Sequence, residues 1–180
     1  MFAYGRYAVN LSNPRHHVWM KLRAILAKEK PDLVGVSVQA NTSASAAMAA
    51  TIVKECAPGA VLVAGGPEAT IRLSDMLDGF DFVVRGEGEN TMAELADSMV
   101  AGTGFDRING LSYLDDGVPI NNLPRELAAD IDAFPFPTRD LILEGEHYLP
   151  EDMGKILSSR GCPFRCRYCA TGIVWAGSHR

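Results

Sequence analysis

The residues with the most distinctive chemistry in this chain are Cys162, Cys166 and Cys169, which follow a CxxxCxxC pattern. One further cysteine, Cys56, occurs among the 180 residues. In a reducing compartment, clustered cysteines are more often metal ligands or catalysts than disulfides. The segment joining the three is too short for their thiolates to reach separate centres. The spacing therefore predicts one metal ion or one cluster.

Two kinds of centre remain open on this pattern. A structural zinc site normally has four protein ligands, and the nearby candidate for the fourth is His179. A 4Fe-4S cluster held by three cysteines instead leaves one iron open for a substrate. Three core thiols without any ligand are a further alternative, which the close spacing disfavours.

The cysteine loop resembles that of the radical SAM enzymes, whose motif is CxxxCxΦC with an aromatic residue at Φ, here Tyr168. The resemblance implies that Cys162, Cys166 and Cys169 hold a 4Fe-4S cluster, that S-adenosylmethionine binds the open iron, and that Tyr168 contributes to the cofactor site. In that family, reductive cleavage of the sulfonium bond produces a 5′-deoxyadenosyl radical, which abstracts a hydrogen from a small-molecule substrate. An electron donor such as flavodoxin or ferredoxin is implied as well. We assign no catalytic residue.

The preceding sequence alternates between strand and helix patterns. Short apolar runs predict strands at 32–38, 60–64 and 80–84. Helices are predicted from Asn13 to Pro31, in an alanine-rich stretch closing at 57–59, over 70–77, and from Glu89 to just before Gly102. This alternation predicts an α/β fold with an open, parallel, flavodoxin-like sheet and right-handed crossovers.

Parallel sheets of this kind bind ligands at the carboxyl ends of their strands, where this sequence reads SVQANTS, AGGPEAT and VRGEGEN. These segments resemble the cobalamin-binding domain that precedes the radical SAM domain in one subclass. The resemblance implies that Ser37 and Thr42 lie near the nucleotide tail of cobalamin. It also places Gly65 and Gly66 where the backbone approaches that tail closely.

The third loop contains Gly86, Glu87 and Gly88 and leads into a helix N-terminus, which can receive polar or anionic ligand groups. A glycine pair after a strand is by itself ordinary turn chemistry, so only the three loops together favour a ligand. The DxHxxG motif that supplies a cobalt-binding histidine in many cobalamin domains is absent. We therefore expect no protein imidazole on cobalt, and we expect His16 and His17 to be solvated.

Three regions are predicted along the chain. Residues 1–103 form an incomplete cobalamin-binding-like α/β domain, in which GRYAVNLS is the second strand and the first strand and helix are missing. Residues 104–153 form a connector, with a β-hairpin around Asp116-Gly117 followed by a proline-rich segment. Residues 154–180 begin a radical SAM partial barrel, with the strand KILSSR from Lys155 and the cluster loop. We expect this truncated chain not to turn over by itself.

Composition and charge narrow the function classes. The net charge of −5 offers no basic surface for a phosphate backbone, so we expect no nucleic-acid partner. No apolar run approaches the roughly 18 residues of a membrane-spanning helix, and MFAYGRYAV lacks the features of a secretory signal. The expected location is the cytoplasm.

The expected function is that of a fragment of a cobalamin-dependent radical SAM enzyme, most simply a methyltransferase acting on an unactivated carbon. A cyclase or rearrangement enzyme of the same subclass is an alternative. Two further alternatives come from other classes. They are a non-catalytic cobalamin-binding module and a zinc-binding interaction protein that uses Cys162, Cys166, Cys169 and His179.

Overall fold

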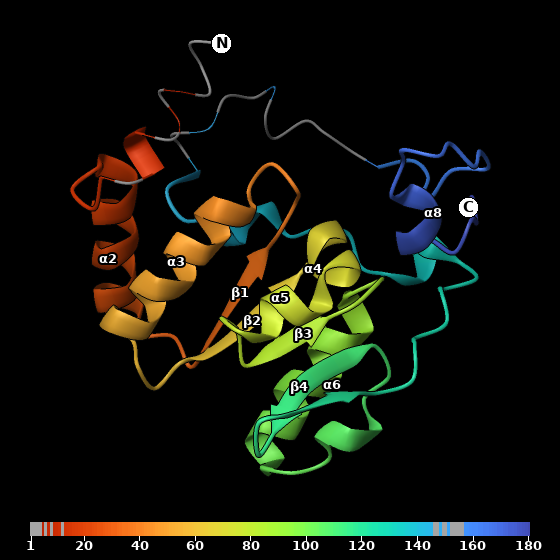
Figure 1. The fold of residues 1–180 in the computed structure, drawn as a ribbon, viewed down its shortest axis with the longest axis horizontal. Coiled ribbons are helices and arrows are strands. Elements are labelled where there is room, and N and C mark those ends of the chain that lie inside the picture. Colours follow the sequence, from red (N-terminus) through yellow and green to blue (C-terminus); the bar gives the residue numbers. More distant parts are fainter. Residues whose placement is uncertain are drawn as a thin grey trace. The chain divides into compact units, whose positions relative to one another are not determined.

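The computed structural model describes residues 5, 7, 9–11, 13–145, 148, 151 and 157–180. The chain divides into two compact units, one running to Arg125 and the other beginning at Glu126. The first unit contains an open sheet flanked by helices, and the second contains short helical turns and the cysteine loop (Figure 1). The boundaries at residues 103 and 153 stay predictions.

The sheet of the first unit has its described strands in chain order. Three parallel strands are followed by an antiparallel pair, and this mixed sheet confirms the predicted α/β class. β1 and β2 pair with Ser37 opposite Gly65, so their carboxyl ends lie at the same edge. The strands are β1 (Leu33–Ser37), β2 (Val61–Gly65), β3 (Phe82–Val84), β4 (Leu111–Asp115) and β5 (Val118–Asn121).

Helices cover both faces of this sheet. Successive residues of a strand point to opposite sides of the sheet, so each face contributes its own side chains to the packing with helices. Leu62 and Val83 pack with α2, α3 and α5, whereas Val63 and Val84 pack with Leu95 of α6. Figure 1 shows α2 and α3 side by side next to β1. The helices of this unit are α2 (His17–Glu29), α3 (Ser43–Cys56), α4 (Pro67–Ile71), α5 (Leu73–Leu77) and α6 (Glu89–Ala101), with the 3₁₀ turn η1 at Phe105–Arg107.

The predicted hairpin forms between β4 and β5. Asp116 and Gly117 have φ angles of 47° and 78°, as expected for the central residues of a tight two-residue hairpin turn. β4 also pairs antiparallel with β3, so the hairpin extends the parallel sheet.

Two local predictions in the first unit are wrong. The segment GRYAVNLS was expected to be a strand, but residues 5, 7 and 9–11 are helical, while Arg6, Ala8 and Ser12 lie outside the described residues. Trp19 Nε1 donates to the Asn10 carbonyl at 3.3 Å, and Leu11 packs against the core, which anchors this helical segment. The single helix expected at 70–77 is two helices, because Arg72 leaves helical geometry with φ −110° and ψ 50°.

The second unit has little regular structure. Its described elements are the 3₁₀ turns η2 (Ile131–Ala133) and η3 (Arg139–Leu141) and the helix α8 (Thr171–Val174). The strand expected from Lys155 is not observed at 157–160, and Lys155 and Ile156 lie outside the described residues. Along the described chain, no helix is both long enough and apolar enough to cross a membrane.

Candidate functional site

The loops after β1 and β2 are tied together by backbone hydrogen bonds. Val38 N–H donates to the Gly65 carbonyl at 2.7 Å, and Glu68 N–H donates to the Val38 carbonyl at 3.1 Å. Because these bonds continue beyond the last paired residues of the two strands, the loops at this edge are held in a defined position before any ligand arrives.

Gly66 is required by the way the second loop crosses the first. Its φ is 94°, and a Cβ at this position would lie 2.9 Å from the Val38 carbonyl oxygen and 3.2 Å from Ser37 Oγ. A Cβ on Gly65 would make only ordinary contacts, the nearest at 3.9 Å from the Val84 carbonyl oxygen. The chain's own β1 loop therefore accounts for the glycine at Gly66, whichever ligand binds nearby.

The third loop lies after β3 and leads into α6. Gly86 has a φ of 70° and open space where a Cβ would be, whereas a Cβ on Gly88 would lie 3.3 Å from Val84 Cγ1. The Glu87 side chain is buried, with 5% exposed. α6 begins at Glu89, so the predicted helix N-terminus does follow Gly88.

A threonine that sequence reasoning missed joins the second and third loops. Thr70 Oγ1 accepts a hydrogen bond from Gly86 N–H at 3.0 Å and donates one to the Gly66 carbonyl at 3.0 Å. The sequence signal was the threonine four residues after Gly66, a spacing that brings a helical hydroxyl to that carbonyl.

Arg85 connects the third loop to the hairpin. Its guanidinium donates to the carbonyls of Leu111, at 3.3 Å, and Asn122. Its Nε is buried without a hydrogen-bond partner in the described part of the chain. Burial lowers the pKa of Arg85 from its ordinary value, because desolvation disfavours the charged form.

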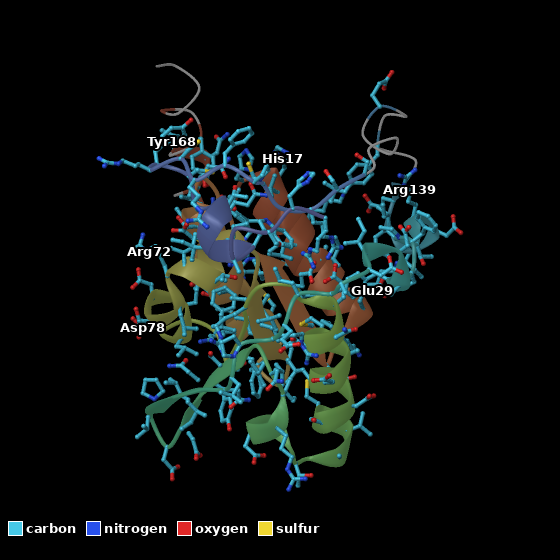
Figure 2. All side chains as sticks on the ribbon, turned by 90° about the vertical axis from the view of Figure 1, so that its right-hand side faces the viewer. His17, Glu29, Arg72, Asp78, Arg139 and Tyr168 are labelled. Atoms are coloured by element: carbon cyan, nitrogen blue, oxygen red, sulfur yellow. The ribbon has the colours of Figure 1, made fainter. Side chains whose placement is uncertain are left out.

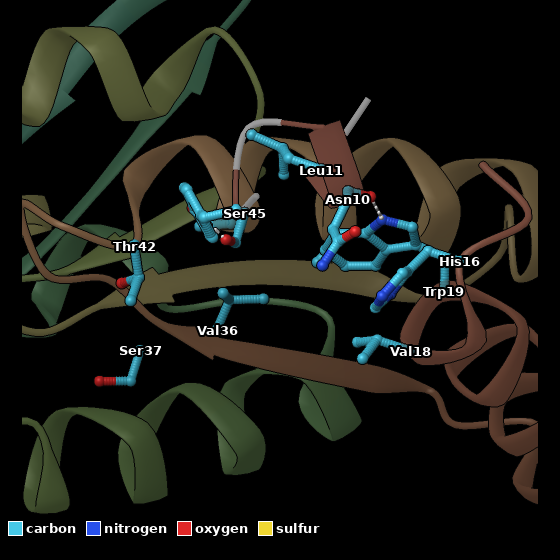
Figure 3. Close-up of a pocket in the computed structure, with 12 residues that line it drawn as sticks. Asn10, Leu11, His16, Val18, Trp19, Val36, Ser37, Thr42 and Ser45 are labelled. Atoms are coloured by element: carbon cyan, nitrogen blue, oxygen red, sulfur yellow. Dashed lines mark hydrogen bonds between the residues drawn. The ribbon is translucent and has the colours of Figure 1, made fainter. Parts of the chain in front are cut away.

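A pocket of about 430 Å³ opens beside β1, between the N-terminal segment, α2 and α3. Figure 3 shows Ser37 and Thr42 toward one end, Trp19 and His16 toward the other, and Val36 between them. No Asp, Glu, Lys or Arg is among its described lining residues. The pocket therefore suits an uncharged, largely apolar group with a few polar atoms.

The polar groups of this pocket are partly engaged. Thr42 Oγ1 accepts from Gln39 N–H at 3.0 Å, which holds the first loop in a turn, and Tyr7 and Ser45 share a hydrogen bond between their hydroxyls. His16 is half-buried at this pocket, whereas His17 is exposed as expected.

In the second unit, backbone pairing closes the cysteine loop at its two ends. The N–H groups of Arg160 and Arg180 each donate to the other's carbonyl, at 2.8 and 2.9 Å, and Cys162 N–H donates to the Ser178 carbonyl at 2.9 Å. Gly161 has a φ of 88°, and a Cβ there would overlap the Ser178 carbonyl oxygen. A glycine at this position is therefore needed for the two ends to meet.

The three cysteines lie on this closed loop with their thiols unpaired. Cys162 is half-buried, and Cys166 and Cys169 are exposed. Tyr168 is 93% exposed and projects into solvent (Figure 2). Among the described residues, no three His, Cys, Asp or Glu side chains are grouped closely enough to hold a metal ion. The common centre remains a prediction, supported by three thiols on one loop.

Cys169 differs from its neighbours in its hydrogen bonding. Its thiol Sγ donates to Thr171 Oγ1 at 3.1 Å, and hydrogen bonding with the Thr171 side chain and backbone lowers the pKa of the Cys169 thiol from its ordinary value. A thiol with a lowered pKa forms the thiolate, which is the metal-binding form, more readily.

Comparison with protein families gives a match to the B12 binding domain over residues 7–96, half of the chain. This range contains the loops after β1, β2 and β3. The match ends before the hairpin and does not reach the cysteine loop.

Similar proteins extend the likeness beyond that range. The chain is 36% identical to an uncharacterized methyltransferase of Pyrococcus horikoshii, with 83% of the chain and 33% of the relative covered. It is 32% identical to the anaerobic magnesium-protoporphyrin IX monomethyl ester cyclase of Rubrivivax gelatinosus, with 86% and 30% covered. The chain thus spans about a third of the length of these curated relatives.

Among solved structures, the fold is similar to the cobalamin-dependent S-adenosylmethionine radical enzyme OxsB with aqua-cobalamin and S-adenosylmethionine bound. The TM-score is 0.68 at 21% identity, and 83% of this chain and 21% of that one are covered. At this identity the likeness concerns the fold, and it agrees with the flavodoxin-like sheet described above.

Proposed function

Because the chain belongs to the B12-binding domain family, we propose that its first unit binds cobalamin at the carboxyl edge of β1, β2 and β3. The observation that carries this proposal is the set of three loops held together by their own hydrogen bonds, the first of which lines the pocket. Ligands of parallel α/β sheets bind at this edge.

The chemistry of the loops fits different parts of cobalamin. The pocket lined by Ser37 and Thr42 has apolar walls, a few hydroxyls, the imidazole of His16 and, among its described lining residues, no Asp, Glu, Lys or Arg, which suits the uncharged base of the nucleotide tail. The open space at Gly86 and the N-terminus of α6 suit polar groups of the ligand.

For the longer protein to which such a chain would belong, we propose a radical SAM activity. Cys162, Cys166 and Cys169 would hold a 4Fe-4S cluster, which supplies an electron for cleavage of S-adenosylmethionine when it is bound. Tyr168 would contribute to the same cofactor site. This proposal is supported by the CxxxCxxC spacing, by the closed loop that carries the thiols, and by the relatives found.

Methyl transfer to a small-molecule substrate is the reaction we favour, because the relative at 36% identity is described as a methyltransferase. Cyclisation is the second candidate, favoured by the 32% identity to a cyclase. Either reaction requires an electron donor, for which flavodoxin or ferredoxin is the expected class.

Titration of the folded chain with hydroxocobalamin tests the first part of the proposal. We expect saturable binding with a change in the visible spectrum of the corrinoid. A folded sample that leaves the spectrum unchanged up to millimolar cobalamin would reject the cobalamin site.

Anaerobic reconstitution with iron and sulfide tests the second part. We expect about four iron and four sulfide per chain and broad absorption near 400 nm, as for a cubane cluster. One colourless zinc per chain would instead support the zinc-binding alternative with His179 as fourth ligand.

A further inference from the structure

We propose that Thr70 is a positioning residue, whose hydroxyl fixes the Gly86 loop relative to the Gly66 loop and thereby holds the cobalamin-binding edge in its binding geometry. The inference rests on the proposed cobalamin site and assigns a role to a residue whose side chain hydrogen-bonds to two of its loops. Thr70 is not among the described residues that line the pocket.

The hydroxyl of Thr70 is part of a continuous chain of hydrogen bonds. Gly86 N–H donates to Oγ1 at 3.0 Å, and Oγ1 donates its own hydrogen to the Gly66 carbonyl at 3.0 Å. A hydroxyl has one hydrogen to donate and lone pairs to accept, so it can serve both loops at once. Such chains polarise each other, and each bond strengthens the next.

Gly86 needs this acceptor because the sheet ends just before it. Arg85 N–H still pairs with the Gly110 carbonyl at 2.8 Å, whereas the next amide, that of Gly86, turns away with a φ of 70° and donates to Thr70. A partly buried N–H that loses its acceptor is costly. Removal of the hydroxyl should therefore release the Gly86 loop from its present position.

The other end of the connection is anchored more firmly. The Gly66 carbonyl also accepts from Thr70 N–H at 3.1 Å, and Glu68 N–H ties the start of α4 to the Val38 carbonyl at 3.1 Å. The second loop is thus fixed to β1 by backbone bonds, and the side chain of Thr70 extends that fixation to the third loop. Among these bonds, only the two made by Thr70 Oγ1 use a side-chain atom.

A merely structural role for Thr70 makes different predictions. Thr51 offers a matched control, because its hydroxyl donates to the Ala47 carbonyl at 3.1 Å, the same four-residue spacing, on the exposed side of α3. If Thr70 only stabilised its own helix, Thr70→Val and Thr51→Val would have the same kind of effect, confined to thermal stability.

The test compares Thr70→Val, Thr70→Ser and Thr51→Val in the 180-residue chain. Hydroxocobalamin affinity is one readout, and hydrogen exchange of the Gly86 amide by NMR, without ligand, is the other. Loss of the hydroxyl should weaken cobalamin binding about tenfold and speed Gly86 exchange at least about tenfold. Thr70→Ser should restore both to within about threefold of the parent chain, and Thr51→Val should change neither.

Thr70→Ala replaces Thr70→Val if the valine variant does not fold. Unchanged cobalamin affinity in a folded variant without the hydroxyl, or failure of Thr70→Ser to restore it, would overturn the inference. Unchanged exchange of the Gly86 amide in the ligand-free variant would also overturn it. If the parent chain does not bind cobalamin, the proposed function fails separately, and the exchange measurement still decides whether Thr70 holds the Gly86 loop.

Discussion

The carboxyl edge of the sheet and the cysteine loop differ in how far hydrogen bonds fix the residues of the candidate site. In the first unit, hydrogen bonds between the loops hold the edge in place before a ligand arrives. In the second, the backbone closes the loop at Gly161, and the three thiols do not form a metal-binding group among the described residues. We expect the loops of the first region to keep their geometry when a ligand binds, whereas the cysteine side chains would have to converge to bind a metal. Binding should therefore depend on backbone shape in one region and on ligand side chains in the other.

The largest effect is expected for a cysteine of the loop. Cys166→Ala removes one of three ligands, so the iron content after anaerobic reconstitution should fall from about four per chain to below about one. Cobalamin affinity of the same variant should stay unchanged, because Cys166 belongs to the second unit. Cys56→Ala, on α3, is the control and should retain the iron. Retention of a full cluster by Cys166→Ala would remove the proposed ligand set.

The next largest effect is expected where the cysteine loop closes. Gly161→Ala places a Cβ against the Ser178 carbonyl, so the pairing of Arg160 with Arg180 should open. Exchange of the Cys162 amide should become at least about tenfold faster, which NMR can measure. Gly172→Ala, with nothing within 4 Å of its Cβ, is the matched control. Equal exchange in both variants would show that closure does not depend on Gly161.

A comparable substitution in the first unit should act on stability. Gly66→Ala combines a φ of 94° with a contact of 2.9 Å to the Val38 carbonyl, and should lower the free energy of unfolding by about 2 to 4 kcal/mol. Gly65→Ala should cost less than about 1 kcal/mol, since its Cβ meets only ordinary contacts. Urea unfolding measures both. Similar losses of unfolding free energy in the two variants would show that the close contact between Gly66 and the loop after β1 does not require a glycine.

These glycines also show how much of the structure could be predicted from the sequence. Apolar runs and the Asp116-Gly117 pair were enough to predict β1, β2, β3 and the hairpin, because local pattern determines those elements. From the sequence, Gly66 was predicted to let the backbone approach the cofactor closely. Its close contact with the loop after β1 could be recognised only from the pairing of the strands. Thr70 was missed for the same reason, since its partner Gly86 is 16 residues away.

Other features depended on information that the sequence pattern does not carry. Residues 9–11 have an apolar and polar mixture that suits a strand, yet the contact of Asn10 with Trp19 holds them in a helical segment. A common metal centre for the three cysteines stays a prediction, because neither the sequence pattern nor the backbone geometry decides it. Their spacing could still be used to predict the kind of ligand.

The smallest effect is expected at the boundary between the third loop and the hairpin. Arg85→Met removes hydrogen bonds to the carbonyls of Leu111 and Asn122, but it also removes a partly desolvated charge. The net loss in unfolding free energy should be about 1 to 2 kcal/mol. Arg107→Met, at an exposed position, should change it by less than about 0.5 kcal/mol. A stabilised Arg85→Met protein would show that the burial cost outweighs these bonds.

The order of the strands in the sheet affects the order in which the chain can fold during its synthesis. Each strand of the sheet lies next to the strand that precedes it in the chain, so pairing can proceed in the direction of synthesis, one strand at a time. The cysteine loop cannot close in this way, since Arg160 needs the carbonyl of Arg180. On a ribosome, the sheet can therefore be complete while the loop that carries the cysteines is still open.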